Sequence, residues 1–89
     1  MFDVEIKIRT IPKVLDNSKN DLLNVIDSWS ISNLKGMWKG KEEDSIEITI
    51  ICDIDKSKEI VSIIANNAKK LGEESIMIGN SFLSLNQLA

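Results

Sequence analysis

The side chains best suited to chemistry are acidic and lie close together in the sequence: Glu42, Glu43, Asp44 and Glu47. Paired carboxylates can act as general acid and base, and several converging oxygens can bind a hard cation. Their spacing matches no known metal-binding loop, and a run of like charges is normally exposed to solvent. We therefore interpret Lys41 to Asp44 as the solvated tip of a hairpin.

Sulfur is the second candidate, since Met37, Met77 and Cys52 could together bind Cu(I). Asp53 follows Cys52 directly, and its negative charge disfavours a reactive thiolate. Methionines on separate strands usually fill a core, and free cysteine is among the most buried residue types. We interpret Cys52 as a buried structural cysteine and leave any metal unassigned.

The residues needed for common enzyme mechanisms are missing from the sequence. There is no histidine, the side chain that most often serves as the base of a hydrolase. The four glycines form neither of the phosphate-binding motifs G-x-x-x-x-G-K-[ST] and G-x-G-x-x-G. We predict a protein that is not an enzyme and that uses no cofactor.

Length and charge restrict the class of protein. The 89 residues suffice for one domain, over 1–89, and the net charge is −3. Arg9 is the single arginine and there is no tyrosine, so we expect no nucleic-acid partner. Neither a signal peptide nor an apolar stretch of the roughly 20 residues that span a bilayer is visible. We expect no membrane association and a cytoplasmic location.

The first elements that would position these residues are a strand and a helix. Apolar residues from Phe2 to Ile8 alternate with charged ones, which is typical of a strand with one buried face. Ser18, with Asp21 three residues later, resembles a helix-capping pair. A helical stripe follows, so we predict a helix over 18–29. Its members are Leu22, Val25, Ile26 and Trp29.

The second half of the sequence contains the remaining predicted elements. We predict an irregular strand over 31–41 and a strong strand whose inward residues are Ile46, Ile48, Ile50 and Cys52. Asp55 as cap and Gly72 as stop predict a helix over 55–71. A short strand, Ile76 to Ile78, turns at Gly79-Asn80. The apolar tail of Phe82, Leu83, Leu85 and Leu88 is expected to cover a sheet edge or a neighbouring subunit.

This order predicts an α+β, ferredoxin-like β-α-β-β-α-β domain with a four-stranded antiparallel sheet. Right-handed crossovers place both helices on one face of that sheet. The other face would carry Glu5, Lys7, Arg9, Glu47 and Thr49. It is either solvated or paired with another subunit.

One segment resembles a known family. Trp38, Gly40, Lys41, Glu43 and Glu47 spell W-x-G-K-x-E-x-x-x-E before a strand. This resembles the second hairpin of the CutA family, within the PII-like trimeric ferredoxin folds, and the closing stretch 74–80 agrees with it. The resemblance implies a homotrimer with Trp38, Lys41, Glu43 and Glu47 at the subunit interface. The family's usual histidine and cysteine positions are not matched, so no metal ligands carry over.

Three functions are consistent with these residues. The first is a non-enzymatic, PII- or CutA-like homo-oligomer, with a trimer favoured, that binds a small ligand or metal between subunits. The second is a small protein–protein interaction or inhibitor module whose target is unknown. The third, ranked lowest, is an enzyme that uses only the carboxylates of Glu43 and Glu47.

Overall fold

Five strands and two helices occupy residues 3–79 and 81–85, the part of the chain that this computed structural model describes. Phe2, Asn80, Leu88 and the side chains of Trp38 and Phe82 lie outside the described residues. The elements, in chain order, are β1 (Asp3–Thr10), α1 (Pro12–Leu23), β2 (Ser30–Trp38), β3 (Lys41–Asp53), α2 (Ile54–Lys70), β4 (Ser75–Ile78) and β5 (Ser81–Ser84).

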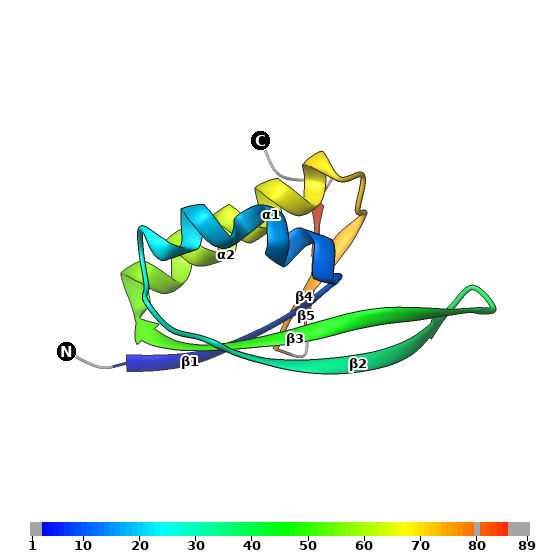
Figure 1. Cartoon of the computed structure of the whole chain (residues 1–89), viewed down its shortest axis with the longest axis horizontal. Helices are drawn as coiled ribbons and strands as arrows, with labels where there is room; N and C mark the ends of the chain where they lie inside the picture. Colours follow the sequence, from blue (N-terminus) through cyan, green and yellow to red (C-terminus); the bar gives the residue numbers. More distant parts are fainter. Residues whose placement is uncertain (1–2, 80, 86–89) are drawn as a thin grey trace.

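Within the described residues, the strands form one antiparallel sheet in the order β2-β3-β1-β4-β5. Both helices cover the same face of this sheet (Figure 1). The predicted α+β, ferredoxin-like fold is therefore confirmed. The sheet has one strand more than the predicted four, because the tail forms β5 against β4, with Ile76 opposite Leu83. Leu85, which is fully buried, joins the end of this strand to the core.

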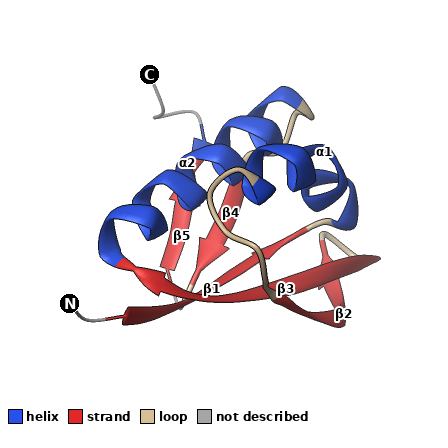
Figure 2. Cartoon of the chain, turned by 60° about the vertical axis from the view of Figure 1, so that its left-hand side comes forward, coloured by secondary structure: helices blue, strands red, loops and turns tan. Residues whose placement is uncertain are grey.

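The core lies between the sheet and the helices (Figure 2). The alternating patterns of β1 and β3 are confirmed, because Ile8 pairs with Ile48 and both side chains are buried. Their outward neighbours Arg9 and Glu47 pair on the opposite, uncovered face. The helices contribute further buried apolar side chains, which are Val14, Leu15, Leu22, Ile60, Ile64, Ala65 and Ala68.

The prediction for α1 was wrong at its start. The helix begins at Pro12, where proline's missing N–H costs nothing because the first turn has no partner for it. Ser18 is a buried residue inside the helix rather than its cap. Its hydroxyl donates to the carbonyl of Val14 at 2.7 Å and accepts from the side-chain amide of Asn67 at 3.0 Å. This contact joins the two helices.

The end of α1 also differs from the prediction of a helix over 18–29. The helix ends at Leu23, and the apolar residues beyond it pack on the core from a loop. They are Val25, Ile26 and Trp29. Side chains in an irregular segment can reach the core as helical ones do, so a stripe of apolar residues did not require a helix.

The second helix agrees with the prediction to within one residue at each end. Its N-cap is Asp53 rather than Asp55, since an Asp53 carboxylate oxygen accepts from the backbone N–H of Lys56 at 2.9 Å. Asp55 lies in the first turn, where negative charge suits the helix dipole. Gly72, at φ +83°, follows the helix as predicted.

The hairpin of β2 and β3 is longer and more regular than predicted. Pairing is continuous from Ser30 opposite Thr49 to Trp38 opposite Lys41. The turn lies at Lys39 and Gly40, whose φ angles of 51° and 79° are typical of a tight two-residue turn. The predicted tip, Lys41 to Asp44, instead forms the start of β3. The hairpin extends past the helices at one end of the molecule (Figure 1).

Candidate functional site near the tip of the hairpin

The four residues predicted at an interface occupy different parts of the hairpin. The backbone of Trp38 pairs with Lys41 beside the turn, and Lys41 and Glu43 have exposed side chains. Glu47 lies further along β3, where it pairs with Arg9 of β1. All four belong to one continuous hairpin, as the motif predicts, but the side chains of Lys41, Glu43 and Glu47 do not form one cluster.

A hollow of about 420 Å³ lies where the hairpin meets the connection between α2 and β4. Its lining residues are Gly36, Met37, Lys39, Glu43, Ser45, Gly72, Glu73, Glu74 and Ser75. Glu43 is the one predicted interface residue among them. Glu73 and Glu74 were not identified as site residues, because nothing local links them to the hairpin. The sequence did indicate that Glu73 and Glu74 lie in a loop, because Gly72 was predicted to end the preceding helix.

The electrostatics of this hollow favour positive charge. Burial raises the pKa of Glu73, and the nearby carboxylates of Glu43 and Glu74 raise it further. Lys39 supplies one positive charge to the same lining. Three carboxylates against one ammonium leave an excess of negative charge. The hollow can therefore hold a proton or a cationic group, whereas an anion there would need additional positive charge.

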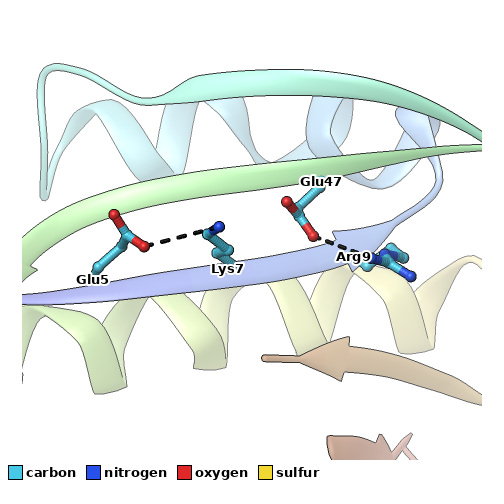
Figure 3. A network of polar contacts seen from close by, with 4 residues as sticks. All are labelled: Glu5, Lys7, Arg9 and Glu47. Carbon is cyan, nitrogen blue, oxygen red and sulfur yellow. Dashed lines mark hydrogen bonds and ion pairs between the residues drawn. The ribbon is translucent and has the colours of Figure 1, made fainter. Parts of the chain in front are cut away.

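The pair of carboxylates in the lowest-ranked hypothesis, Glu43 and Glu47, does not form. Glu43 lines the hollow, whereas a carboxylate oxygen of Glu47 accepts from the Arg9 guanidinium at 3.2 Å on the uncovered sheet face (Figure 3). On the same face, the Lys7 Nζ atom lies 4.0 Å from Glu5 Oε1 (Figure 3). Glu43 and Glu47 therefore lie in different environments. The third hypothesis, an enzyme that uses these two carboxylates together, loses its geometric basis. Nowhere in residues 3–79 and 81–85 do three acidic, cysteine or histidine side chains gather as a metal site would need.

The sulfur atoms do not form a site either. Cys52 is buried, and the pKa of its thiol is raised by that burial and then by the carboxylates of Asp53 and Asp3, partly offset by Lys56. Met37 pairs with Glu42 near the other end of β3. At a rise of roughly 3.3 Å per residue, about 30 Å of strand separates Met37 from Cys52. Cys52 is a structural cysteine, as predicted.

This chain was compared with known proteins by sequence and by structure. No protein-family model matches the chain, and no curated protein sequence matches it. Among solved structures, PII from Arabidopsis thaliana bound to citrate is similar, with a TM-score of 0.67, 16% identity, and coverage of 85% of this chain and 74% of that one. The likeness is one of fold. A DUF3240 family protein from Shewanella baltica is also similar, with a TM-score of 0.68, 10% identity, and coverage of 100% and 96%.

The structure also bears on the membrane prediction. Among the described residues, neither helix combines the length and the apolar character that crossing a bilayer requires.

Proposed function

We propose that this chain is a non-enzymatic PII- or CutA-like homo-oligomer, with a trimer favoured, that binds a small ligand between subunits near the tip of the hairpin. The observation that carries the proposal is the hollow of about 420 Å³, whose walls come from the hairpin and from the connection after α2. Its volume lies within the usual range of small-molecule sites. The likeness in fold to PII, which was crystallised with citrate, supports the same reading.

The charge of the hollow explains why the ligand would lie between subunits. Glu43, Glu73 and Glu74 repel an anion, so one copy alone is a poor site for a carboxylate such as citrate. Lys41 is exposed on the hairpin. A neighbouring hairpin would bring this lysine to the open side of the hollow. A cationic ligand would instead be held by the three carboxylates directly.

Oligomeric state is the first test. Light scattering on the purified chain should give a mass of about three times the 10.0 kDa of one copy. Truncating the hairpin side chains by Trp38→Ala and Lys41→Ala should shift the mass toward that of one copy. A stable species of one chain at all accessible concentrations would refute the oligomer.

Ligand binding is the second test, with citrate as the anionic probe and spermidine as the cationic probe in titration calorimetry. Glu43→Gln should strengthen citrate binding or weaken spermidine binding, because it removes one charge from the hollow. Glu59→Gln, an exposed carboxylate on α2 outside the hollow, is the matched control. If both variants change binding equally, the hollow is not the site.

A further inference from the structure

Among the described residues, no strand lies on β2's side of the end of β3 that is farthest from the hairpin turn. β2 pairs with β3 only as far as Thr49, opposite Ser30, whereas β3 continues to Asp53. On its other side β3 remains paired with β1 to the end, where Asp3 lies opposite Asp53. No backbone hydrogen bond joins residues 24–29, all of them described, to this part of β3. Alternate backbone groups of residues 50–53 therefore face an open edge.

A groove of about 420 Å³ runs along this open edge. Ile51 and Cys52 both line it, although successive side chains of a strand point to opposite faces. The groove is therefore not confined to one face of the sheet, and at the end of β3 it also reaches Asp3 of β1. Leu23, the last residue of α1, and the loop that follows it form the other wall. Ile51 and Leu23 are 66% and 57% exposed, so both lining residues offer apolar surface to an occupant of the groove.

The charges around the groove indicate the chemistry of an occupant. Asp3, Asp27 and Asp53 line it, with Lys56 as the one cation among its lining residues. An added strand would therefore be favoured if it carried basic side chains, with apolar ones between them to meet Ile51 and Leu23.

The chain's own described edge strands do not supply that charge. In β2 the one charged residue is Lys35, which already pairs with Glu42 at 3.7 Å. β5 has no charged residue over Ser81–Ser84. The start of β1, where β4 does not pair with it, carries Asp3, Glu5 and Lys7, which leaves a net negative charge. A second copy would thus bring neutral or acidic edges to an acidic groove.

We propose that this groove binds an extended segment of a partner protein, which adds to the sheet as a strand along residues 50–53. Basic and apolar side chains alternate in the segment. Backbone hydrogen bonds supply most of the affinity, and the aspartates select basic partners. The site lies at the opposite end of β3 from the hairpin hollow, so it does not depend on the function proposed there.

Binding of a labelled KIKVKI peptide, followed by fluorescence anisotropy, tests the proposal. This peptide should bind at least about tenfold more tightly than EIEVEI. Asp27→Asn should weaken binding about two- to fivefold, as expected for loss of one exposed ion pair. Asp21→Asn, an exposed aspartate of α1 outside the groove, should leave it unchanged.

Backbone methylation separates strand addition from simple charge attraction. Two KIKVKI peptides carry N-methyl groups on alternate residues, one set on odd and one on even positions. A strand presents alternate amides to its neighbour, so one set should lose at least about tenfold in affinity and the other little. Amide shifts in NMR spectra should centre on Ile51 to Asp53.

Three results would overturn the proposal. The first is equal affinity for the basic and acidic peptides, and the second is equal tolerance of both methylation patterns. The third is a change in the mass of the peptide-free protein on Asp27→Asn, because the occupant would then be a second copy.

Discussion

Removing the ion pair between Arg9 and Glu47 tests whether the uncovered sheet face is buried against another copy. The guanidinium and carboxylate are 3.2 Å apart, with side chains 48% and 24% exposed in one chain. At this separation Coulomb's law gives about 1.3 kcal/mol at a dielectric constant of about 80, and about 5 kcal/mol at about 20. Ordering two long side chains offsets most of the smaller value, which leaves about 0–1 kcal/mol for a solvated pair.

We predict a coupling energy of about 2–4 kcal/mol, because the proposed oligomer would cover this face and exclude water from the pair. The measurement is a double-mutant cycle of Arg9→Met and Glu47→Gln, read from urea unfolding. The pair between Lys19 and Asp16, 3.5 Å apart on the exposed side of α1, is the control. The coupling energy of this control pair should stay near the roughly 0.3–0.5 kcal/mol that is usual for ion pairs on a helix. That is about a tenth of the upper value predicted for Arg9 and Glu47.

Protein concentration supplies the second readout of the same experiment. The unfolding midpoint of an oligomer rises with concentration, since association stabilises the folded chain by mass action. A coupling below about 1 kcal/mol together with a midpoint that is independent of concentration would refute the reasoning. The face would then be solvated, and Glu47 would not be an interface residue.

Three further predictions concern stability. Ser18→Ala should cost about 1–3 kcal/mol in urea unfolding, because it removes the acceptor of the Asn67 amide, whereas exposed Ser62→Ala should change stability by less than about 0.5 kcal/mol. Gly72→Ala should cost about 1–2 kcal/mol, because φ is +83° there, while Gly36→Ala, where an added Cβ meets no atom within 4 Å, should be nearly neutral. Glu73→Gln should stabilise the fold at neutral pH and lose that advantage as pH falls toward the ordinary pKa of glutamate. The sign follows because a pKa raised in the folded state means that ionisation opposes folding, and pH-dependent thermal melts would contradict it if the advantage grew in acid.

The sequence predicted the elements whose signals are local. The alternation in β1 and β3 and the stripe of α2 identify strands and a helix because each pattern repeats over several residues. The start of α1 was missed because Ser18 and Asp21 imitate a helix cap, while Pro12 serves equally as a strand end and a helix start. The fifth strand was missed because Ser81–Ser84 depends on the edge offered by β4.

The candidate site was predictable in part for a similar reason. The hairpin carries its own motif, so Trp38 to Glu47 could be singled out without the fold. The hollow could not, because Glu43 and Glu73 meet only after β3 and the end of α2 are placed in three dimensions. The open edge of β3 likewise depends on where β2 begins. That boundary is set by the loop at 24–29, whose apolar residues imitate a helical stripe.

The position of β1 at the centre of the sheet has a consequence for how the chain folds. β1 is synthesised before both of the strands with which it pairs, since Arg9 lies opposite Glu47 of β3 on one side and Met77 of β4 on the other. Such long-range pairings require large loops to close, and the entropy lost in closing them precedes the stabilising contacts. This slows folding. A nascent chain that ends before β4 would therefore hold β1 with one side unpaired. We expect fragments that lack the last strands to aggregate, since an exposed apolar strand edge is a template for other chains.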